Sequence, residues 1–399
     1  MADFKGPSSI PRQSAGRGSP RSSSEILASA VSSKIEQGNL KAAVRILCSD
    51  EAPAPPNAQT AEKLRAKHPH MCEERRPFPS MVGDSLCVTQ SAVTQAIKSF
   101  PNGSSGGLDC LRPQHLKDLM CGSDLCEHLI ESATGFVNLL MQGICPAAVQ
   151  NILFGGNLIA LSKKDGGVRP IAVGSVWRRL AAKCANKYAS EKVSCLLSPI
   201  QLGVGVKGGA EAAIHSARRY VHSLRQGTFL IKLDFSNAFN TLRRDAMLEA
   251  VYRDIPEIFN FCHLAYAENS VLLFNEHRIS SEEGPQQGDP LGPLLFALTI
   301  HPILQSLESE FKIGYLDDVS AGGDAATLSR DFAVLTDRAA DMGLQLNIGK
   351  CEIVYAENDS IPPIFGGFKR VLPSECELLG PLFLGARRWT LRWLPGAQI

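Results

Sequence analysis

Two adjacent carboxylates, at positions 317 and 318, lie between two short apolar runs. Residues 311–316 precede them, and the run that follows contains the glycine pair Gly322 and Gly323. This pattern predicts a strand, a tight turn and a second strand. A tight turn does not require two Asp residues, and two like charges side by side repel, which raises the pKa of one carboxyl unless a cation lies between them. The pair is therefore a candidate site for Mg²⁺, which prefers hard oxygen ligands; the alternative is a solvated acidic turn.

Composition indicates the size and class of the protein. At roughly 100–200 residues per domain the chain is long enough for two or three domains. Its 399 residues are 44% apolar and 20% charged, as in a globular protein with a sizeable core. The net charge of +1 is too balanced to indicate a nucleic-acid partner. No apolar run approaches the roughly 18 residues of a membrane span, and the N-terminus lacks the apolar core of a signal peptide.

Cysteine usage favours a reduced, intracellular protein. The 12 cysteines are scattered, and none forms a Cys-x-x-Cys pair, so buried thiols are a better interpretation than a disulfide scaffold. Two groups resemble half of a zinc site but lack a second half nearby, and we interpret both as structural: Cys121, Cys126 and His128, and His68, His70 and Cys72.

Positive charge is concentrated in one stretch. Residues 163–192 hold eight Lys and Arg against two acids, a local charge of +6, and residues 176–197 have the pattern of a helix. Such a stretch is typical of a surface that binds a phosphate backbone or a triphosphate. The alternative is a solvated helix face.

The most regular strand pattern lies at residues 228–235. Phe229, Ile231, Leu233 and Phe235 fall on one face of this strand. Lys232 and Asp234 fall on the other face, with Asp234 at the strand's end. If this strand were antiparallel and adjacent to the hairpin at 311–323, its carboxylate would meet Asp317 and Asp318. Three carboxylates on rigid strands can hold the two cations that phosphoryl transfer requires. The order of strands and helices predicts an α+β, ferredoxin-like sheet with helices on one face.

Four segments in this order resemble motifs A to D of reverse transcriptases, and most closely those of non-LTR (LINE-like) retrotransposons. They are LIKLDFSNAFN, GPQQGDPLGP, YLDD and GLQLNIGK. Upstream, SSGGLDCLRPQHLK and GGVRPIAVGSVWRRLAAK resemble the finger motifs of the same group. The resemblance covers about residues 85–380. It implies a right-hand polymerase fold with a ferredoxin-like palm sheet and helical fingers, and an RNA-directed DNA polymerase activity.

The resemblance also implies roles for single residues. Asp234 and Asp317 would bind two Mg²⁺ ions, for which Mn²⁺ could substitute, with Asp318 as a supporting carboxylate and the carbonyl of Phe235 as a backbone ligand. Lys350 matches the motif D lysine, a candidate proton donor to the leaving pyrophosphate.

Further matches concern the substrates. Phe239 lies where such enzymes exclude a ribose 2′-hydroxyl, although an ordinary core Phe is the alternative. The nucleotide would contact Gln287 and Gly288, and its triphosphate would contact Arg169 together with Lys163 or Lys164. The template and primer would contact Arg178, Arg179 and Lys183, and Leu379 and Gly380 fall in a segment that resembles the primer grip.

The expected organisation has five parts. They are a disordered basic arm (1–23), a helical N-terminal extension and linker (24–84), fingers (85–202), a palm (203–380) and a tail of unclear structure (381–399). Only 19 residues follow Gly380 and they show no thumb-like helix pattern, so we expect a fragment or an altered copy of an element. The expected partners are an RNA template, a DNA primer and dNTPs, without a membrane, in the nucleus or cytoplasm. The alternative function is a catalytically silent nucleic-acid-binding remnant.

Overall fold

The computed structural model describes residues 23–36, 38–48, 53–121, 126–163, 165–356 and 359–376. The chain divides into two units, Met1–Ser49 and Asp50–Ile399. In the first, helices α1 (Ser23–Glu36) and α2 (Leu40–Cys48) contact each other. Residues 1–22, most of the predicted basic arm, lie outside the described residues, as do Lys164 and residues 377–399 with the predicted tail. Within the described ranges, no helix has the length and apolarity needed to span a membrane.

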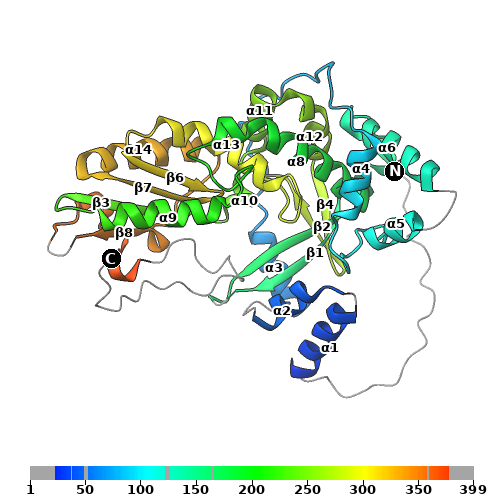
Figure 1. Cartoon of the computed structure of the whole chain (residues 1–399), viewed down its shortest axis with the longest axis horizontal. Helices are drawn as coiled ribbons and strands as arrows, with labels where there is room; N and C mark the ends of the chain where they lie inside the picture. The colour runs from blue at the N-terminus through cyan, green and yellow to red at the C-terminus, as the bar shows by residue number, and fades with distance from the viewer. Residues whose placement is uncertain are drawn as a thin grey trace, which may run out of the picture. The chain divides into compact units, whose positions relative to one another are not determined.

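The second unit contains two sheets (Figure 1). The first has four strands in the order β2-β1-β4-β5. Its apolar face is covered by Ala61 and Leu64 of helix α3. The strands and helix are β1 (Gly156–Ser162), β2 (Val168–Gly174), β4 (Ser270–Phe274), β5 (His277–Ser281) and α3 (Ala58–Ala66).

This sheet does not follow the expected domain boundary. Its strand β1 begins at Gly156, directly after helix α7 ends at Phe154. The boundary expected at residue 202 does not separate the two sheets, because β4 pairs in parallel with β1. Residues far apart in the chain thus complete one sheet.

A group of helices packs around α8. Helix α8 contacts α4, α6 and α7. Its N-cap is Ser175, whose side chain accepts a hydrogen bond from the Arg178 amide at 3.1 Å. The group comprises α4 (Gln90–Lys98), α5 (Pro113–Met120), α6 (Cys126–Met141), α7 (Ala147–Phe154), α8 (Val176–Leu197) and α12 (Phe259–Tyr266), the last preceded by the 3₁₀ turn η1 (Pro256–Ile258).

The second sheet has five strands in the order β6-β7-β3-β8-β9. Along the chain, the first four strands of this sheet are β3, β6, β7 and β8. In the sheet, β3 lies between β7 and β8, which is the ferredoxin-like arrangement that we predicted. Their bounds are β3 (Thr228–Leu233), β6 (Phe311–Tyr315), β7 (Asp318–Asp324), β8 (Glu352–Tyr355) and β9 (Lys369–Val371), with 3₁₀ turns η2 (Ile348–Lys350), η3 (Pro363–Phe365) and η4 (Pro373–Glu375).

Helices cover both faces of this sheet, whereas we predicted one. Phe229, Ile231 and Leu233 of β3 join the core beneath α13 (Gly292–Ser306) and α14 (Ala325–Asp341), and α9 (Gly209–His222) lies on the opposite face (Figure 1). The reason is that Leu230 is fully buried on that opposite face and packs with Val221 of α9. The face is therefore apolar at the start of β3 and polar only at its end, where Asp234 lies.

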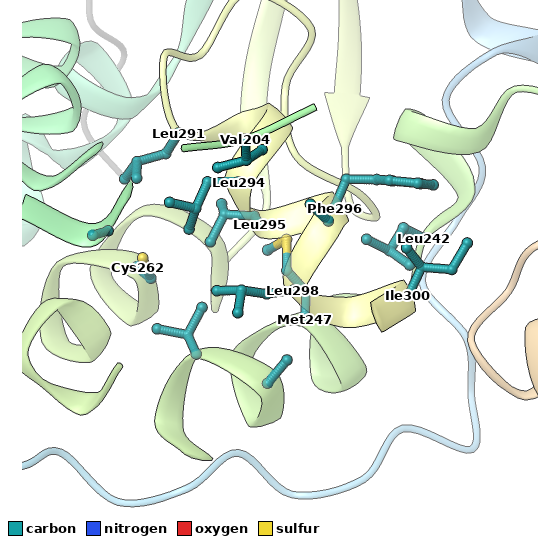
Figure 2. Close-up of a cluster of buried hydrophobic side chains, with 14 of the residues drawn as sticks. Val204, Leu242, Met247, Cys262, Leu291, Leu294, Leu295, Phe296, Leu298 and Ile300 are labelled. Atoms are coloured by element: carbon teal, nitrogen blue, oxygen red, sulfur yellow. The ribbon is translucent and has the colours of Figure 1, made fainter. Parts of the chain in front are cut away.

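Helix α13 lies inside the largest of the hydrophobic clusters of the described residues. This helix is apolar on nearly all sides, and a helix of that kind is buried all round. Figure 2 shows its side chains meeting those of α11 (Arg244–Asp254), α12 and the segment that follows α10 (Ala238–Thr241). The helix thereby fixes the GPQQGDPLGP segment, which leads into it. The labelled side chains are Val204, Leu242, Met247, Cys262, Leu291, Leu294, Leu295, Phe296, Leu298 and Ile300.

Residues 67–88 form no helix or strand, yet they are hydrogen-bonded to later parts of the second unit. The Cys72 amide donates to Glu283 at 3.1 Å, the Arg76 amide to Asp245 at 2.9 Å, and the Leu86 amide to the Glu257 carbonyl at 2.7 Å. The predicted linker therefore lies along the second unit for much of its length.

Candidate active site

The strands that carry the acidic residues are neighbours. β3 and β7 are antiparallel, with Leu233 opposite Val319 and Lys232 opposite Ser320. Continuing this register by one residue places Asp234 opposite Asp318. Side chains in opposite positions of an antiparallel pair lie roughly 5 Å apart at Cβ. The prediction that these two strands are adjacent and antiparallel is confirmed.

The turn before β7 differs in detail from the prediction. Tyr315 pairs with Asp318, so the turn consists of Leu316 and Asp317, and Asp318 is the first residue of β7. We expected both Asp residues at the tip. The structure places Asp317 at the tip and Asp318 on the strand, where it faces Asp234 across the ladder.

The pKa values of the three carboxyl groups are raised. Burial and then the neighbouring Asp317 raise the pKa of Asp318 to about 6. Burial and then Asp234 raise the pKa of Asp317. Burial also raises the pKa of Asp234, although Lys350, Lys163 and Lys232 oppose that shift. The carboxyl groups thus lie close enough to disfavour each other's ionisation, which a bound cation would relieve.

The donor set fits a divalent ion that is shared with a substrate. Over the parts of the chain that the structure describes, no three or more His, Cys, Asp or Glu side chains are gathered as a ready metal cage. Mg²⁺, however, is usually held by one or two carboxylates together with waters and substrate phosphates. Asp234 and Asp317 satisfy that requirement, and Phe235, buried beside them, is joined by a backbone bridge to Leu346.

Cations gather around these carboxyl groups. Burial, followed by Arg169, Lys67 and Lys350, lowers the pKa of Lys163, which lies at the turn between β1 and β2. Arg169 and Lys163 both act on the pKa of Asp317. The structure therefore brings Lys163 and Arg169 of the β1–β2 hairpin and Lys350 of η2 close to the predicted carboxylates.

Two residues near this cluster were not predicted. Lys67, at the end of α3, approaches Lys163, and its carbonyl accepts hydrogen bonds from the side-chain amides of Asn237 at 2.8 Å and Asn240 at 2.9 Å. Asp165 forms an ion pair with Lys350 at 3.3 Å and so links the β1–β2 turn to the motif D segment. Lys67 lies 37 residues before Ser104, where the first of the quoted motif segments begins, so the sequence contains no signal that would have found it.

The motif B glycine lies against the strand β2. Gly288 has a φ of 117°, and a Cβ there would lie 2.4 Å from the Ala172 carbonyl oxygen, so only glycine allows this approach. The Ala172 amide donates to the Gln287 carbonyl at 2.7 Å. The side chain of Gln287 donates to Asn240 Oδ1 at 3.2 Å, which connects motif B to the end of motif A.

Phe239 lies on α10, half-buried. Its ring stacks on that of Phe296 with a centroid distance of 4.9 Å and an angle of 23°. The ring thus has one face packed on the core helix α13, and the residue as a whole is partly exposed. Both the proposed contact with a sugar and the interpretation as a packing residue are consistent with this position.

One predicted nucleic-acid contact is wrong. Arg178 is 1% exposed and cannot reach a template or primer. Its guanidinium donates to Asp289 at 2.9 Å, to Gln286 at 2.6 Å and to the Phe154 carbonyl at 2.7 Å. The ion pair with Asp289 compensates the guanidinium for its lost hydration. It also attaches the motif B segment to α8.

The other predicted contacts of α8 lie on a partly exposed surface. Arg179 donates to the Ser105 carbonyl at 2.6 Å, and both Arg179 and Lys183 lie over the ring of Phe100. Their role in binding a template stays a prediction. Leu379 and Gly380, like Lys164, lie outside the described residues.

Two retrotransposon proteins are similar to this chain in sequence, and an apo telomerase is similar to it in structure. A 132 kDa protein of the retrotransposable element SLACS from Trypanosoma brucei gambiense is 32% identical over 215 residues, which is 51% of this chain and 18% of that protein. The Pol polyprotein of the type-2 retrotransposable element R2DM from Drosophila melanogaster is 30% identical over 212 residues, or 48% of this chain and 20% of that protein. The chain thus spans about a fifth of the length of these relatives. An apo telomerase structure from Candida tropicalis matches with a TM-score of 0.41 and 14% identity, over 52% of this chain and 51% of that one.

The family model for reverse transcriptase (RNA-dependent DNA polymerase) matches residues 161–385. That range contains motifs A to D and most of both sheets. The predicted resemblance to the reverse transcriptases of non-LTR elements is confirmed, and with it the right-hand polymerase fold, in which the five-stranded sheet is the palm. The chain is a member of the reverse transcriptase family.

Proposed function

We propose that this chain is an RNA-directed DNA polymerase, which adds dNTPs to the 3′-hydroxyl of a DNA primer on an RNA template. The observation that carries the proposal is the register of β3 and β7, which sets Asp234 opposite Asp318 with Asp317 in the adjoining turn. The cations of the β1–β2 turn and Lys350 face the same carboxyl groups. A site with carboxylates on one side and positively charged side chains on the other fits a metal-bound triphosphate.

The metal ions are the first part of the proposal. Asp234 and Asp317 would hold two Mg²⁺ ions, or Mn²⁺ in their place, with Asp318 as the supporting carboxylate and the Phe235 carbonyl as a backbone ligand. When bound, the ions would activate the attacking hydroxyl and neutralise charge on the leaving pyrophosphate. The carboxylates supply the fixed negative charge, and the palm strands hold them in place.

The cations orient the substrate. Lys163 and Arg169 flank the β1–β2 turn and would hold the triphosphate through charge-assisted hydrogen bonds. Lys350, which forms an ion pair with Asp165, would exchange that carboxylate for the phosphate and donate a proton to the leaving group. Gln287 and Gly288 would lie beside the incoming nucleotide, and Phe239 beside its sugar.

Primer extension tests the proposal. The full chain is incubated with an RNA template, a DNA primer, Mg²⁺ and dNTPs, and Asp317→Asn is compared with the matched control Asp337→Asn, which removes the same charge from an exposed position on α14. We expect wild type and Asp337→Asn to extend the primer, and Asp317→Asn to lose extension by at least about 1,000-fold because metal binding is lost. Folded wild-type protein that binds the template without extending the primer would instead identify a catalytically silent nucleic-acid-binding remnant.

A further inference from the structure

A buried glutamine lies directly behind the turn that carries Asp317. Gln201 is 0% exposed. Its side-chain oxygen accepts a hydrogen bond from the Leu316 amide at 2.8 Å, and its side-chain nitrogen donates to the Leu316 carbonyl at 3.2 Å. One side chain therefore binds both polar backbone groups of the residue that precedes Asp317.

Leu316 needs such support because of its backbone conformation. Its φ is +59°, in the left-handed region that residues with a Cβ disfavour. A two-residue turn between antiparallel strands requires positive φ, and Asn or Gly usually occupies the position. Leu has no side-chain polar group with which to stabilise this conformation. The hydrogen bonds from Gln201 supply what the turn residue itself lacks.

The segment around Gln201 is fixed against the neighbouring strand. The Gly314 amide of β6 donates to the Ile200 carbonyl at 2.7 Å, and the Leu202 amide donates to the Gly314 carbonyl at 2.8 Å. Two glycines make this approach possible. A Cβ on Gly203 would lie 2.8 Å from the Leu316 nitrogen, and one on Gly314 would lie 2.9 Å from the Gln201 side-chain nitrogen.

We propose that Gln201 is a positioning residue for the acidic turn. It holds Leu316 in the left-handed conformation, and that conformation sets the place of the Asp317 carboxylate relative to Asp234. The effect of Gln201 on catalysis rests on the proposed function, whereas its effect on the conformation of Leu316 does not. Gln is suited to the position because it both accepts and donates; Glu cannot donate when ionised, and Met can do neither with comparable strength.

Hydrogen exchange of the full-length protein is the direct test, since it needs no activity. We expect Gln201→Met, which keeps the side-chain length, to increase exchange of the Leu316 amide at least tenfold in a peptide that covers β6 and β7. The matched control is Leu202→Ala, which removes a buried neighbour on the same segment without touching these hydrogen bonds. If Gln201 acts only in packing, the two variants will change exchange in that peptide equally, and the proposal is wrong.

Metal binding and catalysis provide two further readouts. Mn²⁺ binding, followed by electron paramagnetic resonance, should weaken severalfold in Gln201→Met and stay unchanged in Leu202→Ala. In primer extension, kcat should fall about 10- to 100-fold because a displaced catalytic group costs that much, whereas KM for dNTP should change less than about twofold. The proposal would be contradicted if Gln201→Met and Leu202→Ala changed kcat, KM and melting temperature to the same extent.

A second substitution separates positioning from folding. Glycine adopts positive φ without strain, so Leu316→Gly added to Gln201→Met should restore part of the lost Mn²⁺ affinity. Additive losses in the double variant would overturn the inference. If wild type extends no primer at all, the proposed function fails, but the exchange and Mn²⁺ measurements still decide the role of Gln201.

Discussion

Replacing Asp318 by Asn should stabilise the metal-free protein while it impairs the proposed activity. Asp318 lies at the start of β7, half-buried, beside Asp317 and opposite Asp234. Ionising a carboxyl group in that position is unfavourable, because burial and the neighbouring negative charges both oppose it. Asn has nearly the same shape and carries no charge.

The size and the pH range of the effect follow from the pKa shift. The pKa of Asp318 rises from 3.8 to about 6 on folding, and a shift of about two units corresponds to about 3 kcal/mol. The folded state holds the proton more tightly than the unfolded state, so wild type loses this stability as the pH rises from about 4 to about 6. We therefore expect Asp318→Asn to match wild type below pH 4 and to exceed it by up to about 3 kcal/mol above pH 6.

Urea denaturation in EDTA at a series of pH values measures this difference. Asp337→Asn on the exposed side of α14 is the control, with an expected change within about 0.5 kcal/mol at any pH. Added Mg²⁺ should narrow the gap, since ion binding stabilises wild type more than the variant. A variant that is no more stable than wild type at pH 7, or whose advantage does not change with pH, would refute the reasoning.

Two further predictions concern residues on either side of the site. Arg178→Met should destabilise the protein by about 3–5 kcal/mol in urea denaturation, because it leaves the buried Asp289 carboxylate without its cationic partner. Arg178→Met with Asp289→Leu should recover part of the loss, and a loss below about 1 kcal/mol would mean that the ion pair contributes little to stability. Phe239→Ala should raise incorporation of NTPs relative to dNTPs roughly tenfold in primer extension, because the ring beside the sugar is removed. An unchanged preference would make Phe239 a packing residue alone.

Some of this site could be predicted because its signals are local. The alternation in 228–235 identifies a strand and the face of Asp234, and the paired Asp residues between apolar runs identify the hairpin. Their adjacency followed from requiring the carboxylates to meet, and the register of β3 and β7 agrees. The helix over 176–197 has the same bounds in the structure.

The errors have physical reasons. Helix α8 is buried on most of its circumference and is rich in alanine, so it has no apolar stripe to show that Arg178 faces inward while Arg179 does not. Gln201 and Leu316 are 115 residues apart, and no periodicity links a lone Gln to a distant turn. The tip of the hairpin was misplaced because positive φ at a Leu is not expected from its residue type.

The buried pair of Arg178 and Asp289 has a consequence for how the site operates. Together with the Ala172–Gln287 hydrogen bond, it attaches the motif B segment to α8 and β2. Asp234 and Asp317, by contrast, belong to the five-stranded sheet. Four of the residues proposed to contact the nucleotide, Lys163, Arg169, Gln287 and Gly288, are thus anchored to the four-stranded sheet and α8, so that a movement of that sheet relative to the palm would alter their distance from the proposed metal ligands. The exposed ion pair of Lys350 and Asp165 links the β1–β2 turn of the four-stranded sheet to the palm. A bound triphosphate would take Lys350 from Asp165 and would then replace this ion pair as the link between the two sheets.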